Sequence, residues 1–440
     1  MRSVPPPVII SRGRLFNGLR NEVVCALSLL PRGFRHEQRT SQDARTPVGT
    51  MTETKKEKPI EIDGSVLEGG GQVLRIAVSL SAILGKPVNV YNIRKKRSRE
   101  GLKNQHMKGL ELVTKISNGT IDGCQVNSRE ITLYPGRTTG GRLLEADSES
   151  AGSIALMLQV ALPVLIFAPE TQPTKLILRG GTNCDLAPQI DYCELVLRPW
   201  LKHFGVNFDI EIKRRGYFPK GGGEVEAVIH PITSPLRAVD RTRPGEIVSM
   251  TGYSFAAGGL PLNVAQVMAS GASATLKQDY PCEVNIRRVK EPAEICVGSA
   301  AGIILAVEFS EGCVLGADAL LQKNSRAERL GVNCVRDLIK VMDRGVTVDD
   351  YMQDQLIIFM ALARGKSRIR CHKLSEHAET AIYICEKMTS AKFRISERDS
   401  GTTIIECEGI GWAPPTLDGT PGHSTVEQEI VGDTVEAHHG

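Results

Sequence analysis

The alternation of apolar and polar residues along the chain predicts a series of short β-strands before residue 235. They are residues 60–64, 88–93, 130–134, 176–179, 206–213 and 223–230. Apolar residues at three- and four-residue spacing predict helices between these strands. They are residues 71–84, 102–118, 151–167 and 189–204, with weaker helical patterns at 353–363 and 378–391.

The order strand–helix–strand–helix–strand–strand occurs twice before residue 235 and returns weakly near the C-terminal end. Such repetition indicates tandem units of one small fold, each of which buries its helices on one face of a mixed sheet. We therefore predict an α+β protein built from tandem units. A polar, proline-bearing joint at residues 236–245 marks the end of the second unit.

The composition is that of a folded protein without a strong charge bias. Hydrophobic residues make up 41% of the chain, charged residues 24%, and the net charge is +4. A charge this small does not by itself indicate a nucleic-acid-binding protein, so any contact with a nucleic acid has to come from a local patch. Aromatic residues, at 5%, argue against a stacking platform for single strands. The 11 cysteines form no C-x-x-C pair and no cluster with zinc spacing, so we expect free thiols in a reducing cytosol or nucleus.

Both ends of the chain are predicted to lie outside the folded part. The first fifty residues are rich in arginine and poor in acids, as in mitochondrial transit peptides. We favour a disordered leader over residues 1–58 instead, because such tracts arise easily by chance. Residues 413–440 are polar without apolar periodicity, which predicts a disordered tail. The apolar run at 154–167 is too short to span a bilayer, so it predicts a buried helix and no membrane partner.

A lone histidine, His377, lies where an extended stretch turns into an amphipathic helix. Far earlier in the chain stand the run Glu68-Gly69-Gly70-Gly71-Gln72, then Arg75, and the basic run Arg94-Lys95-Lys96-Arg97. A nucleophilic nitrogen together with several phosphate-holding elements suggests transfer of a nucleotidyl group onto an enzyme histidine. Imidazole suits this role because its ordinary pKa of ~6.5 leaves the neutral form abundant at pH 7.

Each of these features also has a plain structural interpretation. A lone histidine in a folded domain is usually structural, Glu68 could be a solvated turn residue, and most basic clusters are solvated loops. In the functional interpretation, the glycines let backbone N–H groups approach phosphates at the start of a helix. A carboxylate there would repel phosphate unless a divalent cation intervened, which predicts Glu68 as a ligand of Mg2+ or Mn2+. Arg75 has a planar fork that suits phosphate oxygens.

Five passages, in family order and spacing from about residue 59 to 412, make the chain resemble the RNA 3'-terminal phosphate cyclase family. They are Asp63-Gly64-Ser65 with Glu68-Gly69-Gly70-Gly71-Gln72-Val73-Leu74-Arg75; Ile93-Arg94, Arg97, Gly101-Leu102 and Gln105-His106; Gly180-Gly181-Thr182-Asn183 with Ala187-Pro188; Arg215-Gly216-Tyr217-Phe218-Pro219-Lys220-Gly221-Gly222-Gly223-Glu224; and Tyr351 with Asp354-Gln355-Leu356. A single glycine triplet would be weak support, but these ordered passages together with the histidine are specific.

The resemblance implies a fold, an activity and a set of partners. It suggests three tandem repeats of a βαβαββ unit, each like the C-terminal domain of a translation initiation factor, with a smaller α/β insert domain. The first two repeats would occupy residues 59–239, the insert 240–345 and the third repeat 346–412. The activity would be ATP-dependent conversion of RNA 3'-phosphate ends to 2',3'-cyclic phosphates through a covalent histidine-AMP intermediate. No DNA-specific partner is expected, and the expected location is the nucleus, with the cytoplasm as a second site.

The resemblance also implies roles for single residues. His377 falls on the family's adenylated histidine. The positions that would bind ATP are Gln159, Pro188, Tyr351, Asp354 and Gln355. The positions that would bind phosphate and RNA are Arg75, Arg94, Arg97, Gln105 and His106. The chain departs from the family at Lys95-Lys96, where Ala-Gly is typical, and at Ala378-Glu379, where Thr-Gln is usual.

Two other classes of protein share parts of this pattern. A cyclase-like ribosome-biogenesis factor has the same fold but lacks the histidine nucleophile, so the combination of His377 with Arg94 and Arg97 argues against it. An enolpyruvyl transferase is built on related repeats and would be an enzyme of a different class. The basic loop and the glycine-rich run before Gln72 do not suggest that family.

Overall fold

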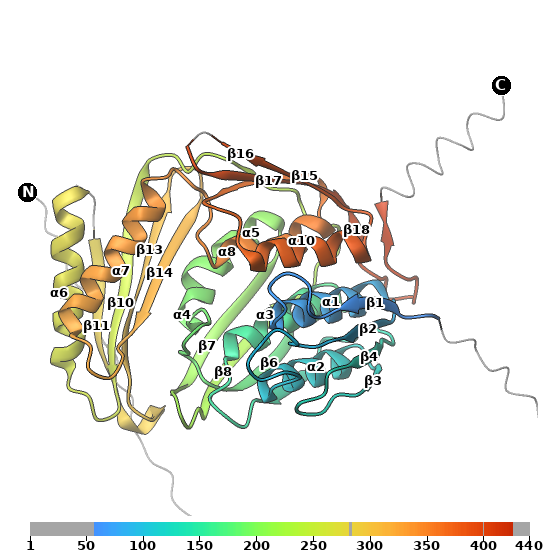
Figure 1. Ribbon diagram of the computed structural model, residues 1–440, viewed down its shortest axis with the longest axis horizontal. Coiled ribbons are helices and arrows are strands. Elements are labelled where there is room, and N and C mark those ends of the chain that lie inside the picture. The colour runs from blue at the N-terminus through green and yellow to red at the C-terminus, as the bar shows by residue number, and fades with distance from the viewer. Residues whose placement is uncertain (1–56, 281–283, 399, 426–440) are drawn as a thin grey trace, which may run out of the picture. The chain divides into compact units, whose positions relative to one another are not determined.

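The computed structural model describes residues 57–280, 284–398 and 400–425, and its elements alternate between helices and strands of mixed sheets (Figure 1). The α+β prediction is therefore confirmed. The predicted leader lies outside these residues, apart from its last two positions. In the described part of the chain, no helix is both long enough and apolar enough to cross a bilayer.

The first sheet has the strand order β1-β2-β4-β3 and follows the predicted pattern closely. Strands β1 (Ile60–Asp63) and β2 (Val88–Tyr91) are parallel, whereas β4 (Ile131–Tyr134) is antiparallel to β2 and to β3 (Thr120–Asp122). Helix α1 (Gly71–Leu84) is buried along nearly its whole length, and α2 (Asn104–Ile116) packs beside it. The apolar residues of α1 surround the helix on all sides, which is typical of a central helix.

The second sheet repeats this arrangement with longer strands. Its order β12-β7-β8-β6-β5 joins β5 (Leu143–Asp147), β6 (Thr174–Gly180), β7 (Asn207–Gly216) and β8 (Gly223–His230). Helix α3 (Ile154–Ile166) follows β5. The helix predicted over 189–204 is α4 (Ile190–Tyr192), a π-helical turn η1 (Cys193–Leu197) and α5 (Arg198–Phe204) in succession. Pro199 accounts for the break, because it has no N–H to donate to the carbonyl four residues earlier.

The third sheet has the order β16-β17-β15-β9. Strand β15 (Arg364–Cys371) is parallel to β9 (Asp240–Arg241) and antiparallel to β17 (Thr403–Ile410), which also pairs with β16 (Lys392–Glu397). Its helices are α8 (Met352–Gln355), α9 (Ile357–Leu362) and α10 (Glu376–Met388). One parallel pair followed by two antiparallel pairs thus occurs in each of these three sheets, while the tandem-repeat prediction itself stays a prediction.

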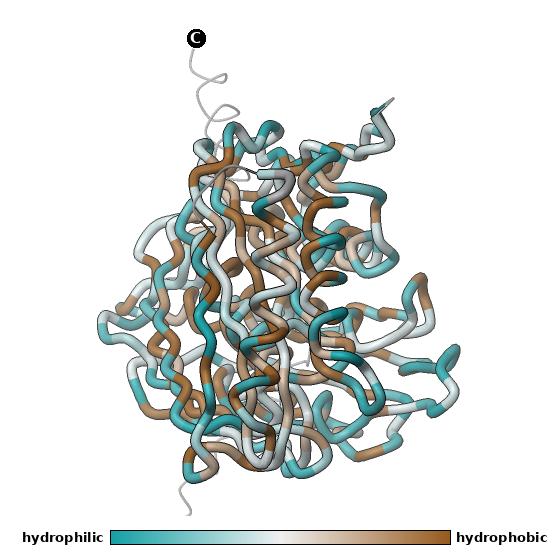
Figure 2. The backbone as a smooth tube through the Cα atoms, turned by 90° about the vertical axis from the view of Figure 1, so that its left-hand side faces the viewer, coloured by the Kyte–Doolittle hydropathy of each residue, from teal (hydrophilic) through white to brown (hydrophobic). Residues whose placement is uncertain are grey.

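A fourth sheet, with the order β11-β10-β13-β14, was not predicted from the pattern. It contains β10 (Ile247–Ala257), β11 (Val284–Glu291), β13 (Ala301–Phe309) and β14 (Val314–Leu320). Helices α6 (Leu262–Asp279) and α7 (Ala327–Met342) cover one face of it (Figure 1). Figure 2 faces the side of these helices and shows hydrophilic and hydrophobic residues alternating along their turns, as expected for helices with one buried face.

Short segments connect the fourth sheet with the rest. A 3-10 turn, η2 (Ala293–Ile295), leads into β12 (Cys296–Val297), which is parallel to β7 in the second sheet. Strand β9 lies within the segment predicted to begin the insert, yet it pairs with β15. The domain boundaries therefore stay predictions, because strands from the predicted insert enter two neighbouring sheets.

The prediction of a disordered tail from residue 413 is wrong for its first part. Strands β18 (Trp412–Ala413) and β19 (His423–Ser424) pair antiparallel. The segment between them is held by Arg137, whose Nη2 donates to the carbonyls of Thr416 and Leu417 at 3.4 and 3.3 Å. Side-chain and backbone bonds of this kind stabilise a polar segment that lacks apolar periodicity. Residues 426–440 of the predicted tail lie outside the described residues.

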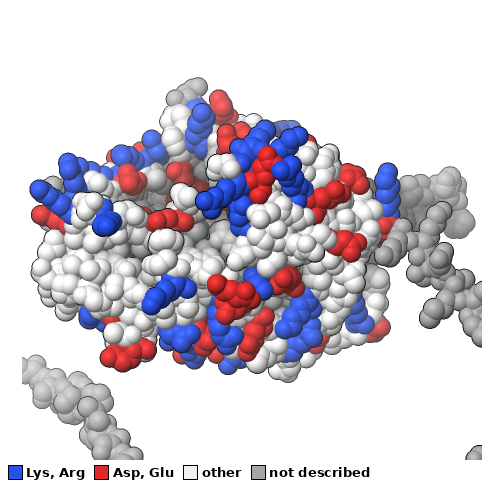
Figure 3. Space-filling model, turned by 60° about the horizontal axis from the view of Figure 1, so that its bottom comes forward, with Lys and Arg blue, Asp and Glu red and all other residues white. Residues whose placement is uncertain are grey.

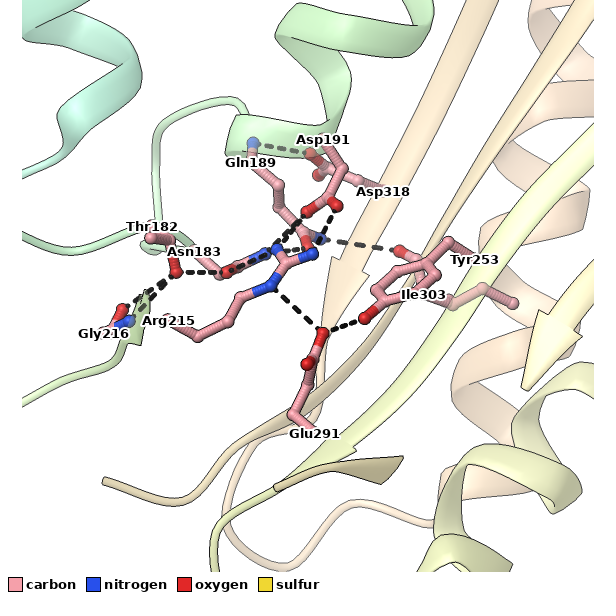
Figure 4. A network of polar contacts seen from close by, with 10 residues as sticks. All are labelled: Thr182, Asn183, Gln189, Asp191, Arg215, Gly216, Tyr253, Glu291, Ile303 and Asp318. Atoms are coloured by element: carbon pink, nitrogen blue, oxygen red, sulfur yellow. Dashed lines mark hydrogen bonds and ion pairs between the residues drawn. The ribbon is translucent and has the colours of Figure 1, made fainter. Parts of the chain in front are cut away.

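A buried polar network lies where the second and fourth sheets meet (Figure 4). Arg215 of β7 donates from Nη1 and Nη2 to the two carboxylate oxygens of Asp191 at 2.6 and 2.7 Å, and its Nε lies 3.2 Å from Glu291 Oε1. The Tyr253 hydroxyl donates to the same Glu291 carboxylate. Burial alone would lower the pKa of Arg215, but Asp191 outweighs it and the pKa is raised. The network thus keeps a buried cation compensated at the junction of the two sheets.

Removing one partner of this cation should be costly. We expect Asp191→Ala to lower the free energy of unfolding by about 3 kcal/mol or more, because it leaves the guanidinium group of Arg215 incompletely paired in the interior. Lys366→Ala is the matched control, since Lys366 and Glu406 form an exposed pair at 3.2 Å, which contributes at most about 1 kcal/mol. Urea unfolding of the full chain measures both changes. Equal losses for the two variants would show that the buried network has no special weight.

Candidate active site

The glycine-rich loop between β1 and α1 turns the Glu68 carboxylate back over the loop. Gly69 adopts a φ of 59°, which favours glycine, and a Cβ at Gly70 would overlap the Glu68 carboxylate in its present position. The Glu68 N–H donates to the hydroxyl of Thr380 in α10 at 3.3 Å. Only 9% of Glu68 is exposed. The loop therefore holds a nearly buried carboxylate against a helix that follows it by some three hundred residues.

The start of α1 is tied to α8 through side chains. Gln72 Nε2 donates to Asp354 Oδ2 at 2.9 Å, and Arg75 Nη2 donates to Gln72 Oε1 at 2.5 Å. Burial lowers the pKa of Arg75, and the negative charges of Asp354 and Glu68 partly offset that effect. The same burial, with a contribution from Glu68, raises the pKa of Asp354 to about 7, while Arg75 lowers it. An arginine and two carboxylates thus share one poorly hydrated space.

The basic loop after β2 reaches the same carboxylate. Arg97 Nη2 donates to the Glu68 carbonyl at 3.1 Å and forms an ion pair with Glu68 Oε1. Arg94 has a φ of 56°, which is uncommon for a residue other than glycine. Burial lowers the pKa of Arg94, and the neighbouring Arg97 lowers it further, against the opposite effect of Glu68. Two cations are thus held close together with one carboxylate near both.

His106 and Gln105, at the start of α2, lie close to Arg75 and the start of α1. His106 Nδ1 accepts the Lys103 N–H at 3.4 Å, and a Cβ at Gly71 would lie 2.6 Å from His106 Nε2. Burial, reinforced by Arg75, Arg94 and Lys103, lowers the pKa of His106 to about 3. The ring is therefore neutral, and its Nε2–H is available as a donor beside the glycine loop. Gln105 Oε1 accepts the Ser153 N–H at 3.4 Å and lines a small cavity with Arg75 and His106.

His377 is the second residue of α10 and is exposed on its outer side. Ser375 caps the helix by accepting the Ala378 N–H at 3.1 Å, and its own N–H donates to Gln353 Oε1 at 3.2 Å. Partial burial lowers the pKa of His377; Glu68 opposes this, whereas Arg75 and Arg97 lower the pKa further. These charges act on His377 because the fold places them around its ring. The imidazole is thus largely neutral at pH 7, as a nucleophile must be.

Only some of the residues predicted to bind ATP contact one another or line the same cavity. Asp354 and Gln355 lie on α8 directly after Tyr351, whose carbonyl accepts from Gln355 Nε2 at 2.7 Å. Gln159 of α3 lines one small, mostly apolar cavity with Gln355. Tyr351 is 36% exposed, and its ring centroid lies 5.6 Å from that of Tyr192. Pro188 is buried in the loop between β6 and α4, away from these bonds.

Several of these residues leave a buried polar atom without a hydrogen-bond partner among the described residues. They are Oε2 of Glu68, Nε of Arg75, Nε of Arg94 and Oε1 of Gln159. Such atoms are rare in folded proteins, because an unpaired buried polar group is costly. Glu68 acts on the pKa values of both Arg75 and Arg94, so the unpaired atoms of these three residues indicate a site completed by a polar ligand with both donors and acceptors.

The free oxygen of Glu68 fits a divalent cation in one respect. A hard cation such as Mg2+ takes oxygen ligands and usually keeps several waters and substrate phosphates. Among the described residues, no group of three or more His, Cys, Asp or Glu side chains could hold a metal ion by itself. An ion at Glu68 would therefore have at most one further ligand of these types, and phosphate and water would complete its coordination.

Two residues of this site were not predicted from the sequence. Gln72 joins Arg75 to Asp354, and Thr380 joins α10 to the glycine-rich loop. A weak signal for Gln72 is its polarity within a helix that is mostly apolar and nearly all buried. His372, the local alternative to His377, directly follows β15, and the described structure gives it none of these bonds.

Basic and acidic residues are interspersed on the face of the molecule drawn in Figure 3. The exposed basic residues of the loop after β2 are Lys95, Lys96, Arg97 and Arg99. A surface of this kind favours local recognition of one phosphate group over attachment along a nucleic-acid backbone.

Comparison with known proteins agrees with the resemblance noted in the sequence. The family model for RNA 3'-terminal phosphate cyclase matches residues 66–395. The RNA 3'-terminal phosphate cyclase of Drosophila melanogaster is 42% identical over 356 residues, which cover 81% of this chain and 98% of that protein. The proteins of the same name from Methanothermobacter thermautotrophicus and Pyrobaculum neutrophilum are 40% and 37% identical. Their alignments cover 79% and 80% of this chain and 99% of each relative.

Proposed function

Because this chain belongs to the RNA 3'-terminal phosphate cyclase family, we propose that it uses ATP to convert RNA 3'-phosphate ends to 2',3'-cyclic phosphates. The observation that supports this most directly is the set of unpaired buried atoms of Glu68 and Arg75, two residues whose charges both act on His377. Arginine donors suit phosphate oxygens, and a neutral imidazole suits attack on phosphorus.

In the first proposed step, a lone pair of His377 attacks the α-phosphorus of ATP. A P–N bond forms, the bond between the α-phosphorus and its bridging oxygen breaks, and pyrophosphate leaves while the imidazole proton passes to solvent. The positive charges of Arg75 and Arg97 offset the charge that gathers on the phosphoryl oxygens. A Mg2+ or Mn2+ ion bound by Glu68 would supply further charge neutralisation.

In the later steps, an oxygen of the RNA 3'-phosphate displaces His377 from the AMP phosphorus and forms an RNA-adenylate anhydride. The neighbouring 2'-hydroxyl then attacks the 3'-phosphorus and releases its proton. The bond between the 3'-phosphorus and the bridging anhydride oxygen breaks, and AMP leaves. Arg94 and Arg97 would hold the 3'-phosphate, with Gln105 and the neutral His106 as hydrogen-bonding neighbours. The closing step is intramolecular and gains from proximity. The sum of the steps is a ligase-type reaction that forms a phosphoric ester and releases AMP and pyrophosphate.

The adenosine of ATP is proposed to lie between the segments that carry Tyr351 and Pro188. Asp354, Gln355 and Gln159 would supply polar contacts to it. We further propose a nuclear location, with the cytoplasm as a second site. The strand order common to three of the sheets supports the interpretation of those sheets as repeats of one βαβαββ unit. A non-catalytic role in ribosome biogenesis is disfavoured, because the nucleophile and both arginines are present.

One assay tests the proposed function. Purified protein is incubated with α-labelled ATP and Mg2+ or Mn2+, with and without an RNA that ends in a 3'-phosphate. We expect acid-labile, alkali-stable label on the protein without RNA, and a cyclic phosphate end with it. A protein that stays unlabelled and leaves the RNA end unchanged would rule out the proposal.

The decline of the self-adenylation rate at acid pH should depend on the charges around His377. Because the pKa of His377 is lowered, we expect the rate to remain near its plateau as the pH falls to 6.5 and to decline only below that value. Glu376 raises the pKa of His377, so Glu376→Gln should move this decline to a still lower pH. Label incorporation is measured from pH 5 to 8 for both proteins. A shift of the variant in the opposite direction would contradict this electrostatic arrangement.

A further inference from the structure

Strand β14 of the fourth sheet contacts both segments that are proposed to enclose adenosine. Asp318 Oδ2 accepts the N–H of Gln189, the residue after Pro188, at 3.1 Å (Figure 4). Two residues earlier in the strand, the Gly316 N–H donates to Asp349 Oδ2 at 2.8 Å. The strand therefore has one hydrogen bond toward the Pro188 loop and another toward the start of α8.

Asp349 transmits the second of these contacts to Tyr351. Its Oδ1 accepts the N–H groups of Tyr351 and Met352, each at 3.0 Å, as a helix-capping carboxylate does. The same oxygen accepts the hydroxyl of Tyr192 at 2.6 Å. Asp349 is 3% exposed, so these bonds are sheltered from water. The position of α8, with Tyr351, Asp354 and Gln355, is thus fixed relative to β14.

The two carboxylates lie on one cavity. Asp318, Asp349 and Tyr351 line it together with residues of β14 and α7. Through its bond to the Gln189 N–H, Asp318 is joined to the buried network of Gln189, Asn183 and Asp191 (Figure 4). A shift of β14 would therefore move the Pro188 loop and the Tyr351 segment together.

We propose that β14 sets the distance between the two walls of the adenosine site, with Asp318 and Asp349 as positioning residues. This inference rests on the proposed function, because ATP is its ligand. It gives the fourth sheet a role in nucleotide binding, although its strands supply none of the side chains proposed to touch ATP.

The chemistry of these carboxylates supports a positioning role. Burial raises the pKa of Asp318 to about 7, and the nearby Asp349 and Asp191 raise it too, while the Gln189 N–H lowers it. Burial likewise raises the pKa of Asp349 to about 6 against the effect of its hydrogen bonds. Two poorly hydrated carboxylates that repel each other are costly for the fold, and apolar residues at both positions would avoid that cost. Their bonds to backbone N–H groups fix geometry, which apolar residues would not do.

The test compares Asp318→Ala with Asp318→Asn, which keeps an acceptor oxygen for the Gln189 N–H. The matched control is Asp337→Ala, because Asp337 lines the same cavity but pairs with Lys340 on the surface, at 2.8 Å. We expect Asp318→Ala to raise the ATP concentration for half-maximal self-adenylation about tenfold, as for loss of a hydrogen bond to a charged group. The rate at saturating ATP should change little, and discrimination against GTP should fall. Asp318→Asn should recover most of the affinity, and Asp337→Ala should match the parent chain.

A second variant and a second measurement complete the test. Tyr192→Phe removes the hydroxyl from Asp349 and should raise the same ATP concentration by a smaller factor, so it decides the matter if Asp318→Ala does not fold. Binding of labelled ATP is measured in parallel by filtration. A parent chain that binds ATP without taking up AMP would overturn the proposed function but leave this comparison of affinities valid. Unchanged ATP affinity and nucleotide discrimination in folded Asp318→Ala and Tyr192→Phe would overturn the positioning role of β14.

Discussion

Replacement of His377 by alanine is expected to reduce covalent attachment of AMP to an undetectable level. The reason is chemical, because the P–N bond needs a neutral imidazole at this position and alanine offers no nucleophile. The substitution should leave the fold intact, since His377 is exposed and the cap of α10 is formed by Ser375. Label from α-labelled ATP, followed on the denatured protein, measures the effect.

His372→Ala and His106→Ala are the controls for this experiment. His372 lies outside the network around Glu68, so its removal should leave labelling close to that of the parent chain. His106 is close to Gly71 and Arg75, so its removal should reduce labelling without abolishing it. Persistent labelling of His377→Ala would place the nucleophile elsewhere, and loss of label only in His372→Ala would assign it to His372.

The helices and strands that were predicted correctly are those in which apolar residues recur with a single regular spacing. Helix α1 and strand β8 have the predicted bounds, because apolar residues recur at helical spacing along α1 and buried and less buried positions alternate throughout β8. Strand β3 was missed because none of its residues is buried, and β5 because only Leu144 is. Strand β13 was missed for the opposite reason: nearly all of it is buried, so apolar and polar residues do not alternate.

For the site, the residue types were predictable but their partners were not. The glycine-rich run, the basic loop and His377 each predict phosphate chemistry, and each can be recognised within one short segment of the sequence. The Gln72–Asp354 bond joins residues 282 positions apart, and the Glu68–Arg97 pair joins residues 29 apart. No local period encodes such pairs, because they arise only when separate helices and loops pack together. The positions of Asp318 and Asp349 beside β14 are hidden for the same reason.

An ion pair connects the residues proposed to bind RNA with those proposed to bind metal and ATP. Arg97, which would hold the 3'-phosphate, is paired with Glu68, which would bind the metal, and both act on the pKa of His377. A cation at Glu68 would compete with Arg97 for the carboxylate and leave its guanidinium group free for phosphate. Binding of metal-ATP and of the RNA end should therefore favour each other, as reciprocal coupling requires.

An RNA that ends in a 2'-deoxy 3'-phosphate is expected to stop the reaction after activation. In the proposed reaction the final nucleophile is the 2'-oxygen, so its absence leaves no group that can close the ring. The end should accept AMP from His377 and accumulate as the capped anhydride, with cyclic product reduced to an undetectable level. Matched ribo- and deoxy-terminated oligonucleotides of several sequences, separated by size and charge after reaction, measure both species.

The sequence arms of this experiment test how the RNA end is recognised. Few aromatic residues, a net charge of +4 and interspersed surface charges (Figure 3) all favour a grip on the terminal phosphate over contacts with bases. Ribo ends of every sequence should therefore cyclise at similar rates. Cyclisation confined to one sequence would contradict recognition of the end, and cyclic product from a deoxy end would exclude the 2'-oxygen as the nucleophile. A chain that adenylates none of these 3'-phosphate ends would lack the step that connects His377 to RNA.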